Sequence, residues 1–254
     1  MVNLTDAFKS IGYAIPKFDP RAGTILVTDA TGVIGHRVAM KLLAAGFPTV
    51  RVGVSQPENA QHLAKMGAQV VAFDFDNTLT YAGAFEGVKS VYLAVPHHSN
   101  WKQKFDTLLT IAKKHGVRHF VKLSISHALA SAAETMENLV TAARLNDPFL
   151  KVPLVLMHRE IDSKLMKMND MYSYTILFAS HFMSNPIVYQ GDSIRKDHCF
   201  KGASQSHGVA YVSPNDVADV AVRALLAPRD FHRTGINLTG PEAIKDVQIA
   251  EILR

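Results

Sequence analysis

The sequence predicts an α/β fold in which a parallel β-sheet is covered by helices on both faces. The first observation is an alternation: between residues 24 and 124, short β-branched or apolar runs alternate with segments whose apolar residues recur at helical spacing. The second is a glycine-rich turn between the first run and the first helical segment. The third is composition, because 254 residues with 48% apolar and 19% charged side chains suit a domain with a large core.

The first strand and helix are the best defined. Thr24–Thr28 is a short β-branched run, which favours a strand. Ile34–Ala45 carries apolar residues every three to four positions, and Gly46 follows it. This spacing gives a helix one apolar face, and a glycine at its end is a common stop signal.

The same pattern continues to residue 124. Nearly continuous apolar strands indicate a parallel sheet buried on both faces. Further strands are predicted at Thr49–Val54, Gln69–Phe73, Ser90–Val95 and His119–Ser124, and helices at Glu58–Met66, Leu79–Glu86 and Trp101–Lys114.

The second half of the chain is less regular. Helical spacing predicts helices around Ala132–Leu145, Arg159–Met168 and Asn215–Leu226, and short apolar runs predict strands at Tyr174–Phe178 and Thr234–Leu238. We expect Asn185–Gly208 to be an irregular linker.

Composition and charge exclude several classes of protein. The net charge of +5 comes from 27 basic and 22 acidic residues with no basic run, which argues against a dedicated nucleic-acid surface. Apolar stretches such as Val91–Val95 fall far short of the ~20 residues of a membrane span. The single cysteine, Cys199, favours a reducing, intracellular compartment, with the cytoplasm expected and an organelle left open. The 12 histidines show no zinc-site spacing, so no metal is predicted.

The glycine-rich turn reads Asp29-Ala-Thr-Gly32-Val-Ile-Gly35. At a strand-to-helix junction, Gly32 lets the backbone approach a pyrophosphate, and Gly35 lets the helix pack on the strand. The helix N-terminus adds amide donors and partial positive charge. The turn therefore predicts a dinucleotide-binding, Rossmann-type doubly wound sheet, although Asp29 stands where the fingerprint has its first glycine.

From about Gly23 onward the chain resembles the NmrA-like family of atypical short-chain dehydrogenase/reductase proteins. The resemblance implies a Rossmann NAD(P)-binding domain with a small C-terminal substrate or lid region. Some members are NAD(P)H-dependent reductases of quinones or related acceptors, and others are redox sensors or regulators. The segments that carry it are Thr28–Gly35, Gly67–Asp76, Phe85–Val88, Val121–Ser124, His158–Asp162, Tyr174–Leu177, Phe182–Asn185 and Leu238–Ala243.

The resemblance also implies domain bounds. Residues 1–22 form an N-terminal extension, and residues 23–254 form the NAD(P)-binding domain. Within that domain, residues 23–157 are the Rossmann core, and residues 158–254 hold the remaining strands and the substrate region.

Candidate site residues are carried over from the family position by position. His158 and Ser124 are the candidate catalytic residues, and His97 and Asn185 are expected in the substrate pocket. The expected cofactor contacts are Ala30, Thr31, Gly32, Val33, Ile34 and Gly35 at the pyrophosphate, Ser55 at the adenosine ribose, Asp74 and Phe75 at the adenine, and Ala94, Val95 and Pro96 at the nicotinamide.

The chain departs from the family pattern in ways that bear on function. Asp29 places a carboxylate near the pyrophosphate, where two like charges at ~4 Å repel by about 1 kcal/mol in water and about 4 at an effective dielectric of 20. Ser55 replaces the arginine that pairs with the 2′-phosphate of NADP, so the choice between NADP and NAD stays open.

Two further departures concern catalysis. The wider superfamily uses a Tyr-x-x-x-Lys pair, whose only match here, Tyr13 to Lys17, precedes the first strand and contains Pro16. Phe178-Ala179 replaces the Arg-Pro that usually follows the Tyr-Thr-Ile-Leu strand.

The resulting prediction is an NAD(P)H-dependent oxidoreductase acting on a quinone-like or other small acceptor. The alternative is a non-catalytic redox-sensing, regulatory or structural Rossmann subunit that contacts a partner protein. A minor alternative rests on Asp74-Phe-Asp76-Asn-Thr78, which spells the D-x-D-x-T motif of haloacid-dehalogenase-like phosphatases. The sequence predicts no oligomeric state.

Overall fold

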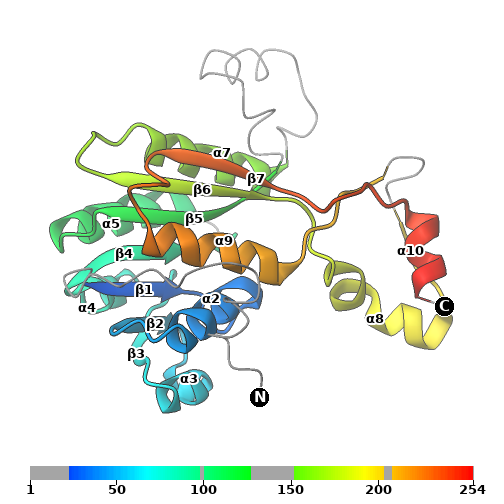
Figure 1. Ribbon diagram of the computed structural model, residues 1–254, viewed down its shortest axis with the longest axis horizontal. Helices are drawn as coiled ribbons and strands as arrows, with labels where there is room; N and C mark the ends of the chain where they lie inside the picture. The colour runs from blue at the N-terminus through cyan, green and yellow to red at the C-terminus, as the bar shows by residue number, and fades with distance from the viewer. Residues whose placement is uncertain (1–22, 98–99, 127–151, 203–207, 254) are drawn as a thin grey trace.

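The computed structural model describes residues 23–97, 100–126, 152–202 and 208–253, and its centre is one parallel sheet (Figure 1). The strand order is β3-β2-β1-β4-β5-β6-β7, which extends the usual order of doubly wound dinucleotide-binding sheets by one strand. The predicted fold class is therefore confirmed. The strands are β1 (Thr24–Thr28), β2 (Val50–Val54), β3 (Gln69–Ala72), β4 (Val88–Leu93), β5 (His119–Ile125), β6 (Ser173–Ala179) and β7 (Thr234–Leu238).

Helices connect the strands and cover both faces of the sheet (Figure 1). Two predicted helices, Glu58–Met66 and Leu79–Glu86, begin with a short 3₁₀ turn. The helices are α2 (Val33–Ala44), α3 (Gln61–Lys65), α4 (Tyr81–Phe85), α5 (Trp101–Lys114), α7 (Pro153–Met166), α8 (Asn185–Asp197), α9 (Pro214–Leu226) and α10 (Asp246–Ile252), with 3₁₀ turns η1 (Pro57–Ala60) and η2 (Thr78–Thr80).

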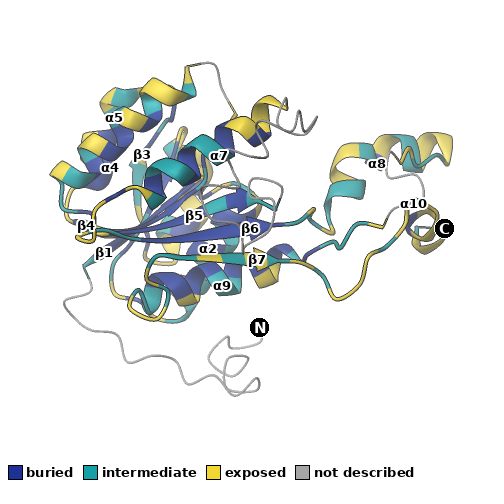
Figure 2. Ribbon diagram, turned by 90° about the horizontal axis from the view of Figure 1, so that it is seen from above, coloured by how far each residue is buried: buried dark blue, intermediate teal, exposed yellow. Residues whose placement is uncertain are grey.

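The core has two layers, one on each side of the sheet. Successive side chains of a strand point to opposite faces, so Ile25 and Val27 pack with α2 and α9, whereas Leu26 packs with α4, α5 and α7. Large side chains such as Tyr81 and Phe105 are fully buried. In Figure 2 the strands at the centre of the sheet are drawn mostly in dark blue, the colour of buried residues. Burial of such a side chain contributes roughly 1.5–3 kcal/mol.

The order of the strands fixes where a ligand binds. From β1 the chain first builds outward through β2 and β3, and then returns to add β4 on the other side of β1. In open α/β sheets, ligands bind outside the carboxyl ends of the strands at such a reversal. Thr28 links the ends of β1 and β4 at this edge. Its Oγ1 donates to the carbonyl oxygen of Tyr92 and accepts from the backbone N–H of Ala94, both at 3.0 Å.

Two predictions of local structure are wrong. Asn185–Gly208 is not an irregular linker throughout, because α8 occupies Asn185–Asp197. Pro186 lies in the first turn, where its missing N–H is tolerated and its fixed φ favours a helix. For the same reason α7 begins at Pro153 rather than Arg159, which places His158 inside the helix.

Other predictions are not tested. The predicted helix Ala132–Leu145, the extension 1–22 and the pair Tyr13 and Lys17 lie outside the described residues.

The C-terminal part of the chain forms an arm, α8 and α10, which extends beyond one end of the sheet (Figures 1 and 2). Gln190 of α8 holds the returning chain through hydrogen bonds to the backbone of Lys201 at 2.7 and 2.8 Å. Val209 and Ile244 form an antiparallel bridge. Helix α10 lies in a segment where no helix was predicted. None of the helices described has the length and apolar character to cross a bilayer.

Candidate functional site

A cavity of about 770 Å³ lies at the carboxyl ends of the strands, at the reversal of strand order. Its size falls in the range of small-molecule and cofactor sites. It runs from the glycine turn over β2 and β3 at one end to β5, β6 and the start of α8 at the other. Among its lining residues are Asp29, Gly53, Phe73, Leu123, Ala179, His181, Phe182 and Tyr189.

The glycine turn has the geometry that phosphate binding requires. Asp29 takes a positive φ of 52°, a conformation that glycine enters freely and aspartate tolerates. At Gly35, an added Cβ would lie 2.1 Å from the carbonyl oxygen of Asp29, so only glycine allows α2 to pack this closely. Gly32 provides the N-cap of α2 with no side-chain cap, which leaves the first amides to a ligand.

Asp29 is the one group of the turn that opposes an anion. A Cβ placed on Gly32 would lie 2.1 Å from Oδ2 of Asp29. The carboxyl group of Asp29 therefore lies against the glycine that should admit the pyrophosphate. Its side chain has no ion pair or hydrogen bond with another described residue. Although Asp29 is open to the cavity, the protein around it displaces water and raises its pKa.

The structure brings most of the predicted site residues into one cavity. The predicted residues that line it are Thr31, Ser55, Asp74, Phe75, Ala94, Val95, Pro96, Ser124, His158 and Asn185. Ala30 and Ile34 bury their side chains in the core, so only their backbone faces the turn. Gly32, Val33 and Gly35 form the turn and the start of α2. His97 is exposed just beyond Pro96 and is not among the lining residues.

Below the cavity, two further side chains, Lys122 and Asp162, join the predicted Ser124 and His158 in a buried polar cluster. Lys122 of β5 is fully buried, and its Nζ lies 2.7 Å from Nδ1 of His158 and 2.7 Å from Oδ1 of Asp162. Ser124 donates its hydroxyl proton to Oδ2 of Asp162 at 2.6 Å. The available signals were a lysine inside an apolar strand and an aspartate one helical turn after His158.

The cluster controls the charge of His158. Burial, then the charge of Lys122, and then His97 lower the pKa of His158, so its imidazole is neutral. Burial and pairing act in opposite directions on both groups. Burial lowers the pKa of Lys122, and the charge of Asp162 raises it. Burial raises the pKa of Asp162, and the charge of Lys122 lowers it. The two groups form an ion pair that keeps the buried charges compensated.

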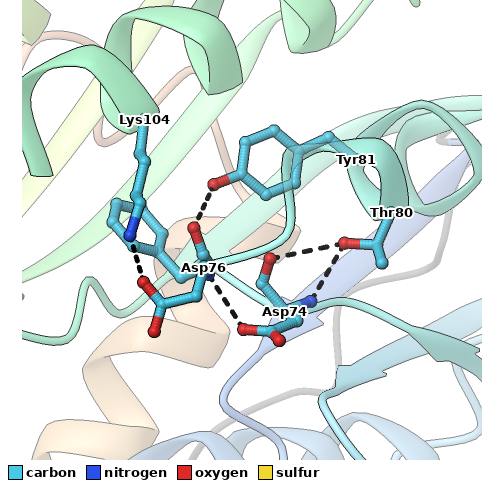
Figure 3. A network of polar contacts seen from close by, with 6 residues as sticks. Asp74, Asp76, Thr80, Tyr81 and Lys104 are labelled. Carbon is cyan, nitrogen blue, oxygen red and sulfur yellow. Dashed lines mark hydrogen bonds and ion pairs between the residues drawn. The ribbon is translucent and has the colours of Figure 1, made fainter. Parts of the chain in front are cut away.

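The side chains of the phosphatase-like motif take part in a structural turn. Asp74 follows β3, an edge strand, and its Oδ1 accepts from the backbone N–H of Asp76 at 2.9 Å (Figure 3). Thr80 donates its hydroxyl proton to the backbone of this turn, and Tyr81 donates to the carbonyl of Phe75 at 2.7 Å. Asp76 pairs with Lys104 of α5. These side chains build a turn that lines one end of the cavity.

Comparison with known proteins supports an NAD(P)-binding protein. A family model described as NAD(P)H-binding matches residues 30–228. The chain belongs to this NAD(P)H-binding family. The match covers the glycine turn from Ala30 onward, strands β2 to β6, and α9, and it leaves out β1 and β7.

Several similar proteins are oxidoreductases or reductases by name. An uncharacterized oxidoreductase of Bacillus subtilis is 28% identical over 236 residues, which are 90% of this chain and 69% of the relative. An NAD(P)H azoreductase of Xenophilus azovorans is 26% identical over 229 residues, or 90% of this chain and 72% of the relative. The crystal structure of an NADPH-dependent quinone oxidoreductase of Escherichia coli with NADPH superposes with a TM-score of 0.71 at 23% identity, covering 90% of this chain and 74% of that one.

The residues present fit a nicotinamide dinucleotide, except that the carboxyl group of Asp29 opposes the binding of its pyrophosphate. The uncapped α2 N-terminus and Gly32 suit the pyrophosphate, and the exposed Ser55 suits a ribose hydroxyl. Gly53 brings β2 close to Phe73, since a Cβ there would lie 2.8 Å from the Phe73 Cβ. Asp29 is the group whose negative charge works against the fit.

Proposed function

We propose that the chain is an NAD(P)H-dependent reductase of a quinone-like or other small acceptor. The observation that carries the proposal is that one cavity joins the glycine turn to Ser124 and His158. A site for a diphosphate and a site for a polar acceptor atom are then continuous. The names of the reductase relatives support the same class of reaction.

The proposed roles follow from position. Backbone amides at Val33 and Ile34, in the first turn of α2, hold the diphosphate. Ala94, Val95 and Pro96 form the wall beside the acceptor end. A reduced nicotinamide dinucleotide, when bound, supplies a hydride to the acceptor. His158 donates a hydrogen bond to the acceptor atom that gains charge, and solvent supplies the proton that completes the reduction.

Turnover tests the proposal. With purified full-length chain, NADPH or NADH and menadione, we expect acceptor-dependent loss of reduced-cofactor absorbance. His158→Gln should lower kcat/KM about a hundredfold, because removal of one positioned donor has effects of this order. The control is His232→Gln, an exposed histidine that does not line this cavity. No acceptor-dependent oxidation with either cofactor would refute the proposal.

Asp29 favours a second candidate, a non-catalytic Rossmann subunit that binds the cofactor weakly. A carboxylate against Gly32 weakens diphosphate binding without disturbing the fold. This candidate predicts no acceptor-dependent oxidation by the wild-type chain, even at a pH low enough to protonate Asp29. A binding function would then rest on the sheet and the arm.

A further inference from the structure

The buried Lys122 occupies a costly position that the fold alone does not require. Its side chain is 0% exposed in the middle of the sheet, where an apolar residue would pack without loss of hydration. Its ammonium group joins two side chains of α7, His158 and Asp162, which lie on the same face of that helix. Lys122 therefore links the floor of the cavity to a residue in the cavity wall.

The hydrogen bond to His158 determines where the imidazole carries its proton. An ammonium group has donors and no acceptor, so Nδ1 of His158 must accept from Lys122. A neutral imidazole that accepts at Nδ1 carries its proton at Nε2. Nε2 has no partner among the described residues, and His158 lines the cavity. The N–H of Nε2 is thus left for a ligand.

Ser124 does not offer an equivalent donor. Its single hydroxyl proton is donated to Oδ2 of Asp162, at 2.6 Å. Toward the cavity, Ser124 has only lone pairs. Of the two predicted catalytic side chains, His158 alone can donate a hydrogen bond to a bound acceptor.

We propose that Lys122 is a positioning residue that holds His158 as a neutral hydrogen-bond donor toward a substrate atom with a lone pair, such as a carbonyl or quinone oxygen. The substrate part rests on the proposed function. The groups facing the imidazole are Lys122 from β5, Asp162 from α7 through Lys122, and His97 from the segment after β4. The cationic Lys122 disfavours a second proton on His158, so the donor is kept over the whole neutral range.

Nitrogen NMR of ¹⁵N-histidine-labelled full-length chain tests the positioning directly, without cofactor. His158→Gln assigns the signal. In the wild-type chain we expect a neutral His158 with its proton on Nε2 between pH 5 and 8. Lys122→Met should give a mixture of tautomers and a pKa that moves up toward the ordinary value of ~6.5. Lys122→Arg, which keeps a cationic donor, should restore the Nε2–H form in part.

The control is Lys102→Met, which removes an exposed lysine near α7 and should leave the His158 signals unchanged. A wild-type His158 that is protonated near pH 6.5, or that carries its proton on Nδ1, would overturn the proposal. This result needs only the wild-type chain and His158→Gln, so it stands if Lys122→Met fails to fold.

Kinetics then separates the positioning from the reaction. With NADPH and menadione, Lys122→Met should lower kcat by roughly tenfold or more with a smaller change in KM, and Lys122→Arg should recover part of the loss. Lys122→Met should also introduce a dependence of kcat on pH, below 6.5 because His158 stays buried, that the wild type lacks. The expected NMR result without wild-type turnover would support the positioning and refute the proposed reaction.

Discussion

Asp29 is the residue on which cofactor affinity depends most. In the turn Asp29 adopts a backbone conformation that glycine usually takes, with a φ of 52°. Unlike glycine, it adds a negative charge. Its carboxyl group lies against Gly32, where a diphosphate would approach the backbone. The same residue therefore preserves the shape of the site and weakens its attraction for anions.

The raised pKa of Asp29 predicts proton-linked binding. Protonation removes the charge that repels the diphosphate, so affinity should rise as the pH falls toward the raised pKa of this carboxyl group. We use NADH for this titration, because it lacks the 2′-phosphate that itself titrates in this range. Asp29→Asn should bind NADH at least about fivefold more tightly at pH 8, which corresponds to ~1 kcal/mol of relieved repulsion.

Calorimetric titration at several pH values measures this effect. Asp29→Asn should show a flatter pH profile, and Asp29→Gly tests the turn with the residue of the usual fingerprint. Equal NADH affinities for the wild type and Asp29→Asn at pH 8 would contradict the account.

At the scale of elements, β5 and α7 are joined by a buried ion pair as well as by apolar packing. Lys122 and Asp162 are 0% and 1% exposed, and Ile161 and Leu165 of the same helix are fully buried beside them. Removal of one partner leaves the other charged and without compensation in a dry site. Such losses are much larger than those at surface pairs.

Lys122→Met should therefore lower the free energy of unfolding by about 3–5 kcal/mol. Lys102→Met is the matched control, because its pair with Glu160 of α7 is 60% and 41% exposed and should contribute less than about 1 kcal/mol. The double variant Lys122→Met/Asp162→Leu should recover most of the loss, since no charge stays buried. Urea unfolding measures all three, and equal losses for Lys122→Met and Lys102→Met would refute the assignment.

How much the sequence predicted depends on the kind of signal. The strands from β1 to β7 were found because strands of a parallel sheet are short runs rich in β-branched and apolar residues, and the glycine turn located the cavity. Helix α8 was missed because Asn185–Gly208 was expected to be an irregular linker, whereas Pro186 in the first turn starts a helix. Lys122 was missed because pairing between β5 and α7 is a long-range contact that no local pattern shows.

At the scale of the whole molecule, one sheet edge gathers all parts of the candidate site. The turn after β1, the ends of β2 to β6, and the start of α8 reach one cavity from segments spread over 160 residues of chain, Asp29 to Tyr189. The arm continues from this edge, and Ile187, Val188 and Tyr189 on it are more than half exposed. Ligand binding at the cavity should thus stabilise the whole sheet rather than a single loop.

The most direct test of the central claim, that the chain binds a nicotinamide dinucleotide at the glycine turn, is calorimetric titration of the full-length chain with NADPH and NADH at pH 6. We predict binding of one dinucleotide per chain, loss of binding in Gly35→Ala, where a Cβ would lie 2.1 Å from Asp29 O, and unchanged binding in Gly83→Ala, where a Cβ meets nothing within 4 Å. Circular dichroism confirms that each variant is folded. No heat of binding with either dinucleotide, for both the wild type and Asp29→Gly, would contradict the claim.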